Sequence, residues 1–122
     1  MDNSITERRL LITTNGSGAA TVLGEPVVGY LEAVEWVDGT LADGVDAVIS
    51  MTLTPSGVDR TLVTLTNAND DAWYQVRVNE HDTTGVATGG KTRPLVRGTP
   101  KVVVAQGGDT LSGAVILHIL RI

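Results

Sequence analysis

The chain of 122 residues contains no cysteine and no phenylalanine, and it has only two tryptophans and two tyrosines. The lack of cysteine excludes a disulfide scaffold, a thiol nucleophile and any metal site that uses cysteine ligands. With so few aromatic rings, a core must be built mainly from Val, Leu, Ile and Ala. The length suits one domain that buries a sizeable core.

Runs of basic residues and long apolar runs are also missing. Fourteen acidic residues against nine Lys and Arg give a formal net charge of −5, which argues against a dedicated nucleic-acid-binding protein. The most apolar stretch, GAVILHIL near the C-terminus, is too short to span a bilayer. The N-terminal stretch MDNSITERRLLITT has no apolar run of the kind that a secretion signal needs. We therefore expect a soluble protein without a secretion signal that binds neither nucleic acid nor membranes.

Glycine, in contrast, is abundant, and turn-forming stretches such as NGSG, DGTLADG and QGGD recur at short intervals. The segments between them are short and rich in Val, Leu, Ile and Thr, which is typical of an all-β sandwich or barrel. We predict a β-sandwich, jelly-roll-like, of eight or nine strands, formed by residues 8–122 after a flexible N-terminal arm at 1–7. The expected strands are 8–14, 19–24, 27–37, 45–54, 59–66, 73–81, 94–97, 101–105 and 111–121.

Alternation of apolar and polar residues predicts which side of each strand faces the core. Within 27–37 the alternation changes phase at Ala33–Val34, which predicts a β-bulge. The last strand is apolar on both sides, with Leu117 on one face and Ile116 on the other. A strand of this kind is expected to be buried on both faces. Its outer face is then covered either by the protein's own loops or by another subunit.

Residues 85–92, GVATGGKT, match the phosphate-binding P-loop pattern G-x-x-x-x-G-K-[ST] at every specified position. A working P-loop also needs a buried parallel strand before it and a helix that begins at the Lys-Thr pair. Here the preceding segment alternates as a half-exposed strand does, and Gly98 and Pro100 end any helix within two turns. We interpret residues 85–97 as a glycine-rich mobile loop, with Lys91 and Arg93 meeting acidic groups of a neighbouring subunit.

The densest group of chemically versatile residues is NEHD, at 79–82. Adjacent side chains on a strand point to opposite faces, so Glu80, His81 and Asp82 do not converge on one point. Asp82 is followed by Thr-Thr-Gly, which is typical of a turn. His81 and His118 do not have the spacing of a zinc site. We predict no catalytic residue, no cofactor and no resident metal.

Two further groups leave room for ligand binding. Acidic loop residues could hold calcium only weakly, because they lack the regular spacing of an EF-hand; they are Asp38, Asp43, Asp70 and Asp71. An exposed aromatic ring could bind carbohydrate, with Trp36 and Trp73 as the candidates. With so few aromatic residues in the chain, these rings are expected instead to anchor the core or an interface.

Three stretches together resemble small structural proteins encoded by tailed bacteriophages. They are TLTNANDDAWYQVRVNEHDTTGVA at 64–87, RPLVRGTPKVVVAQGGDTLSGAVILHI at 93–119 and GYLEAVEWVDGTLADGVDAVISMT at 29–52. In those proteins a segment similar to Y-x-x-R…HDTTG precedes RPLV-x-G and then a VVVAQGG…SG strand pair. The shared motifs are strand and turn patterns and include no catalytic signature.

The resemblance implies a non-enzymatic virion protein of β-sandwich or jelly-roll type. We expect a capsid decoration protein that stabilises the head by binding the major capsid protein or other virion proteins, as a homo-oligomer and in particular a trimer. A head–tail junction or tail component is one alternative, and a carbohydrate-binding module is another. The expected interface residues are Trp73, Lys91, Arg93, Ile116, Leu120 and Ile122.

Overall fold

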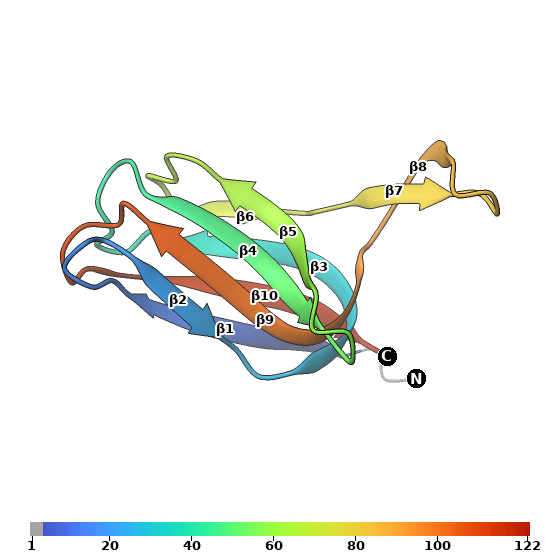
Figure 1. Ribbon diagram of the computed structural model, residues 1–122, viewed down its shortest axis with the longest axis horizontal. Coiled ribbons are helices and arrows are strands. Elements are labelled where there is room, and N and C mark those ends of the chain that lie inside the picture. Colours follow the sequence, from blue (N-terminus) through green and yellow to red (C-terminus); the bar gives the residue numbers. More distant parts are fainter. Residues whose placement is uncertain (1–3) are drawn as a thin grey trace.

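The computed structural model describes residues 4–122, and within that range it contains strands and turns but no helix (Figure 1). The predicted all-β class is therefore confirmed. No element of this range has the length and apolar character of a membrane-spanning helix. The strands are β1 (Ile5–Thr13), β2 (Ala20–Leu23), β3 (Val27–Val37), β4 (Asp46–Leu53), β5 (Asp59–Leu65), β6 (Ala72–Tyr74), β7 (Val78–His81), β8 (Ala87–Thr92), β9 (Leu95–Ala105) and β10 (Ser112–Arg121).

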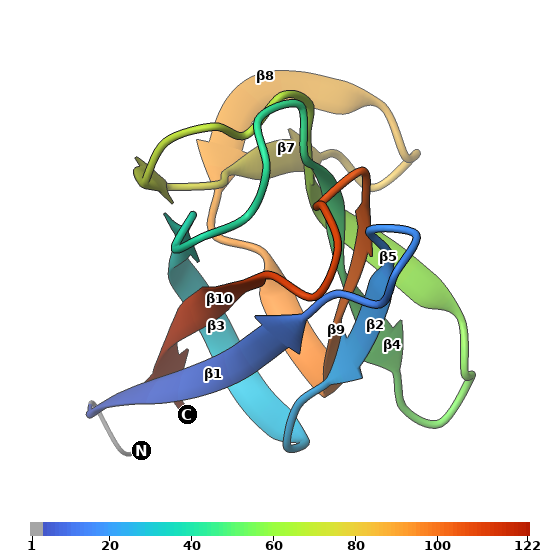
Figure 2. The ribbon, with the colours of Figure 1, turned by 90° about the vertical axis from the view of Figure 1, so that its left-hand side faces the viewer.

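Eight of these strands form two antiparallel layers, one in the order β6–β3–β10–β1 and the other in the order β2–β9–β4–β5. Figure 2 shows the layers from one end of the sandwich. Among the eight strands, the first pairs with the last, the second with the seventh, the third with the sixth and the fourth with the fifth. This wrapped pairing is that of a jelly roll, so the predicted jelly-roll-like sandwich is confirmed.

Strand β9 belongs to both layers. Its first residues, Leu95–Gly98, pair with β3, whereas residues 101–104 pair with β2 in the opposite layer. Gly98 stands at the corner with a φ of +146°, and a Cβ there would lie 2.0 Å from the carbonyl oxygen of Thr52. Only glycine fits such a close approach. The strands predicted separately at 94–97 and 101–105 are therefore one continuous strand.

The core between the layers is almost entirely aliphatic, as the composition requires. The inward-facing residues of β10 are Val115, Leu117 and Ile119, and none of them is exposed. Trp36 is the largest buried side chain, and its indole N–H donates a hydrogen bond to the carbonyl oxygen of Ala68 at 3.0 Å. Burial of each such side chain contributes about 1.5–3 kcal/mol before entropy is subtracted.

Two boundaries differ from those expected. The bulge in β3 lies at Glu32, because Leu31 pairs with Ile119 while Ala33 pairs with the preceding residue of β10. It is thus adjacent to the predicted position at Ala33–Val34. Strand β1 begins at Ile5, so residues 5–7 of the predicted N-terminal arm are part of the sheet. Residues 1–3 of that arm lie outside the described residues.

Candidate functional site

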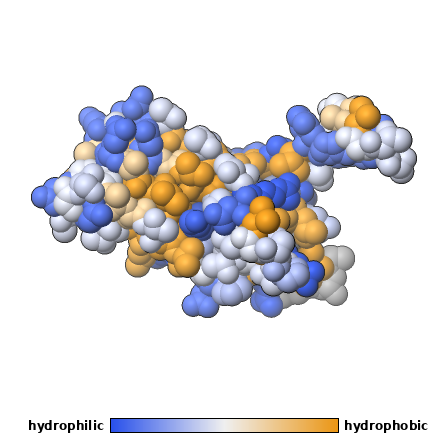
Figure 3. All heavy atoms as spheres, in the orientation of Figure 1, coloured by the Kyte–Doolittle hydropathy of each residue, from blue (hydrophilic) through white to orange (hydrophobic). Residues whose placement is uncertain are grey.

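A β-hairpin projects from one end of the sandwich (Figures 1 and 3). Its strands β7 and β8 pair with each other, with Val78 opposite Thr92 and His81 opposite Ala87. Extended segments join it to β6 on one side and to β9 on the other. In Figure 3 the hairpin is a separate, mostly hydrophilic lobe that stands clear of the body and carries some apolar surface. We call residues 75–94 the arm.

The arm corrects two predictions. The strand expected at 73–81 is interrupted, because only 72–74 pair with β3 and the chain then leaves the body. The loop expected at 85–97 contains β8 and the start of β9. No helix follows Thr92 in the described part of the chain, so the geometry that a P-loop requires is absent there.

The tip of the arm is organised by Asp82. Its Oδ1 accepts hydrogen bonds from the hydroxyl of Thr84 at 2.7 Å, from the backbone N–H of Thr84 at 2.9 Å and from that of Val86 at 3.0 Å. These hydrogen bonds, that of the Thr84 hydroxyl first, hold the pKa of Asp82 below its ordinary value. The turn predicted at Asp82 is confirmed, and the carboxylate is a structural group of the tip.

The root of the arm is fastened by Glu32, the bulge residue of β3. The Oε1 of Glu32 lies 2.8 Å from Nη1 of Arg93, and its Oε2 lies 4.0 Å from Nη2 of Arg77. Arg77 also donates a hydrogen bond from Nη1 to the carbonyl oxygen of Glu32 at 3.2 Å. Arg77 precedes β7 and Arg93 follows β8. One residue of the body therefore holds both ends of the arm.

Beyond its root, the arm has no core behind it. Between Val78 and Thr92 every residue is exposed except Val78 and Gly90, which are half-buried. A two-stranded hairpin without a third strand or a packed face is marginally stable in water. Contacts within the arm are polar, such as that between the Lys91 ammonium and the side-chain oxygen of Asn79. The arm therefore gains a buried face only when a partner covers it.

A second cluster of polar side chains lies on the outer face of the layer that contains β10. Nε2 of His118 lies 3.1 Å from Oε1 of Glu35, and Nδ1 lies 4.0 Å from Oε1 of Glu7. The His118 ring packs on Trp73 with 4.7 Å between ring centroids, and Trp73 is 55% exposed. No hydroxyl group in residues 4–122 is hydrogen-bonded to this histidine. The group therefore lacks the nucleophile–base pair of a hydrolase.

The six predicted interface residues lie in separate places. Lys91 and Arg93 are on the arm, where their charges contact groups of their own chain. Ile116 is on the outer face of β10 but is only 9% exposed, because it lies between neighbouring strands with Arg9 and Glu35 opposite it. The remaining residues are Leu120, which is half-buried, and Trp73 and Ile122, which are exposed.

At the end of the sandwich away from the arm, the acidic loops come together. Burial, followed by the negative charges of Asp43, Asp71 and Asp70, raises the pKa of Asp38. The backbone N–H of Asp38 donates to Oδ1 of Asp71 at 2.8 Å, while the Oδ1 of Asp38 is buried without a hydrogen-bond partner. Within residues 4–122 no group of three or more potential ligands is arranged to hold a metal ion.

Comparisons with known proteins give little beyond this geometry. No family model matches the chain, and no curated protein is significantly similar to it. A solved structure described as the crystal structure of FLHE aligns with 97% of this chain and 99% of that chain, at 14% identity and a TM-score of 0.45. Likeness at that level supports no conclusion about function. What the fold and the site define is a jelly roll that carries a projecting hairpin arm.

Proposed function

We propose that this chain is a non-enzymatic structural protein of a tailed bacteriophage virion, and specifically a capsid decoration protein that binds the head surface through its arm. The observation that carries the proposal is the arm itself, an extended hairpin that is fastened at its root by Glu32 and has no core of its own. The resemblance of the sequence to phage structural proteins is the second support. The jelly roll supplies a rigid platform, although a fold alone does not define a function.

The arm offers two kinds of contact to a protein surface. Within residues 4–122, strands β7 and β8 pair only with each other, so the outer edge of each presents backbone N–H and C=O groups to a further strand. The tip adds Val86, which is 59% exposed. A partner that covers these groups supplies the buried face that the arm lacks. Many copies on a repeating head lattice then gain avidity from contacts that are individually weak.

The proposed partner is the major capsid protein or another virion protein, and the proposed location is the virion. We further propose a homo-oligomer, with a trimer as the first expectation. The activity requires no cofactor, because binding rests on burial and backbone pairing. A head–tail junction or tail position would use the same arm on a different lattice.

Purified particles of the phage that encodes this chain test the proposal directly. Quantitative mass spectrometry of separated heads and tails is expected to find the protein in many copies on heads. A small fixed number of copies at the neck or tail would favour the junction or tail alternative. Absence of the protein from purified particles would contradict a structural role.

Exposure of Trp73 favours one second candidate, a carbohydrate-binding module. Its ring stands beside a hollow of about 280 Å³ that Glu35 and Asp71 also line. Glycan-array binding that is lost in Trp73→Ala would support this candidate. Tyr30→Ala is the matched control, because Tyr30 is also an exposed ring, at 39%, on the same layer. Trp36, the other ring considered from the sequence, is buried and cannot take this role.

A further inference from the structure

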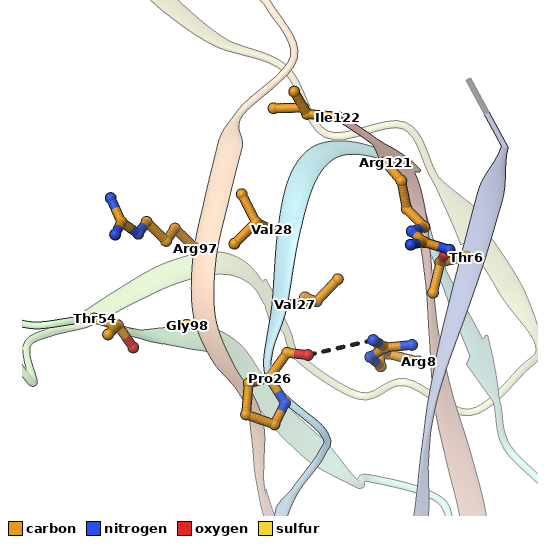
Figure 4. A pocket seen from close by; sticks show the side chains of 10 residues that line it. All are labelled: Thr6, Arg8, Pro26, Val27, Val28, Thr54, Arg97, Gly98, Arg121 and Ile122. Carbon is orange, nitrogen blue, oxygen red and sulfur yellow. Dashed lines mark hydrogen bonds between the residues drawn. The ribbon is translucent and has the colours of Figure 1, made fainter. Parts of the chain in front are cut away.

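An open pocket of about 570 Å³ lies at the end of the sandwich from which the arm projects (Figure 4). Its size is within the range of sites that bind ligands or peptide segments. Part of its lining is apolar, from Val27, Val28 and Ile122. Polar groups come from both layers, with Thr6 on β1 and Thr54 just after β4. The pocket is thus an opening at the end of the jelly roll.

The charged side chains that line the pocket are all basic, although the net charge of the chain is −5. Its lining includes Arg8, Arg97 and Arg121, and none of the described residues that line it is acidic. Figure 4 shows Arg8 and Arg121 extending toward the same region beside Thr6, whereas Arg97 points away across β9. The pocket therefore suits a carboxylate that is attached to an apolar group.

Arg8 is the residue that most clearly needs a further partner. Its Nη2 donates to the carbonyl oxygen of Pro26 at 3.3 Å, and its Nη1 lies 3.4 Å from the carbonyl oxygen of Glu7. Its Nε is buried and has no hydrogen-bond partner within residues 4–122. A carboxylate in the pocket would give the terminal nitrogens of Arg8 a charged acceptor in addition to these long contacts with carbonyl groups.

The arm tip has the complementary chemistry. Glu80 on β7 and Asp82 in the turn that follows are both exposed, and the Oδ1 of Asp82 is already engaged in the hydrogen bonds of the turn. The carboxylate of Glu80 forms no ion pair within residues 4–122. Val86, exposed across the turn, matches the apolar part of the pocket. The arm tip thus offers a carboxylate next to an apolar side chain, and the pocket offers guanidinium groups next to an apolar wall.

On the basis of the assembly role proposed above, we infer that the pocket of one copy receives the arm tip of a second copy, while the outer edges of β7 and β8 remain for the head surface. The arm points away from the body, so its tip is carried clear of its own pocket (Figure 1). Arm root and pocket lie at the same end of the sandwich, which allows copies grouped around one axis to exchange arms. A contact between two different surfaces of this kind closes into a ring when the rotation that relates successive copies brings the last copy back to the first. A trimer is such a ring.

Complementation between two variants tests the exchange. In the first, Val78–Thr92 is replaced by Gly-Ser, which is feasible because Val78 and Thr92 are paired neighbours; this variant keeps the pocket but has no arm. In the second, Arg8→Gln and Arg121→Gln remove the two positive charges that extend toward Thr6 in the pocket and leave the arm. Sedimentation velocity is expected to show an oligomer for the unmodified chain, monomers for each variant and a one-to-one heterodimer for their mixture. A mixture that stays monomeric would overturn the exchange.

A single substitution at the arm tip tests the same contact without altering any residue of the pocket. Glu80→Arg, at an exposed position, is expected to weaken self-association at least tenfold. Asp43→Arg, the same charge reversal at an exposed acid of the opposite end, is expected to leave it unchanged. Equal self-association of Glu80→Arg and the unmodified chain would contradict the pairing of tip and pocket.

The outcomes separate this inference from the virion role. If arm deletion abolishes binding to phage heads while the pocket variant self-associates normally, the tip binds another virion protein and the exchange between copies is wrong. If the two variants complement each other but purified particles lack the protein, the exchange holds and the virion role is wrong.

Discussion

At the scale of single residues, the position of the arm depends mainly on Glu32. The bulge at this residue lets one carboxylate contact both Arg77 and Arg93. The side chain of Arg93 is 45% exposed and that of Glu32 is 27% exposed, so the ion pair adds little to global stability. Its effect is local, because it limits the directions in which the arm can point.

We expect Glu32→Gln to make the arm more mobile without unfolding the jelly roll. The backbone order parameters of residues 78–92, measured by NMR relaxation, should fall, while those of β3 and β10 stay the same. The thermal midpoint should change by no more than about 2 °C, since a partly exposed ion pair contributes little. Glu25→Gln is the control, at an exposed glutamate that forms no ion pair with the described residues 4–122. An arm that is equally ordered in Glu32→Gln would contradict this role of Glu32.

Asp38 provides a prediction with a definite pH dependence. Its pKa in the folded state is raised by burial and by Asp43, Asp71 and Asp70, so its ionised form costs stability at neutral pH. That cost disappears as the pH falls through the raised pKa to the ordinary value of 3.8. Asp38→Asn should therefore raise the thermal midpoint at pH 7 by a few degrees and have no such effect below pH 3.8.

Asp109→Asn is the matched control for this measurement, because Asp109 is exposed and is not a cause of the shift. An Asp38→Asn midpoint that is lower than that of the unmodified protein at pH 7 would mean that the Asp38 carboxylate is stabilising. That result would contradict a raised pKa for Asp38.

At the scale of elements, β9 makes the jelly roll possible by changing layers at Gly98. Residues 95–98 pair with β3 and residues 101–104 with β2. Pro100 stands between these two segments, where one side of β9 has no neighbouring strand to receive a backbone N–H. Gly98 and Pro100 were the reason to expect two separate strands, and they are the residues that a corner in one continuous strand requires.

Gly98→Ala should destabilise the protein by about 3 kcal/mol or more, because the new Cβ would clash with the backbone of Thr52. Gly57→Ala isolates the steric part of this effect. Gly57 also has a positive φ, of +75°, but nothing lies within 4 Å of a Cβ built there, so its cost should be about 1 kcal/mol. Urea unfolding measures both values. Equal costs for the two changes would contradict the corner role of Gly98.

The strand positions could be predicted from the sequence because the pattern is local. In the predicted strand 45–54, the alternate residues Ala47, Ile49 and Met51 are all buried in the core. The same signal did not separate β6 from the arm, since residues 73–81 are extended and alternate throughout. What differs is the partner, which is β3 for 72–74 and β8 for 78–81. The alternation of apolar and polar residues within a segment does not indicate which distant strand that segment pairs with.

At the scale of the whole molecule, the sequence identified several site residues but not their arrangement. Arg93 was expected to meet an acidic group of a neighbouring subunit, and within its own chain it forms an ion pair with Glu32. Ile116 was expected at an interface because β10 is apolar on both faces, but adjacent strands leave it only 9% exposed. The contact of Trp73 with His118, and the pocket around Arg8, join strands far apart in the chain. Only the folded topology brings these residues together.

The most direct test of the proposed role is a binding experiment with phage heads that lack this protein. The unmodified chain and the variant in which Gly-Ser replaces Val78–Thr92 are mixed with such heads and sedimented together. The two proteins should have the same thermal midpoint, because the arm adds no core to the sandwich. We predict saturable binding of the unmodified chain and loss of binding in the armless variant. Equally tight binding of the armless variant would contradict the claim that the arm is the functional site.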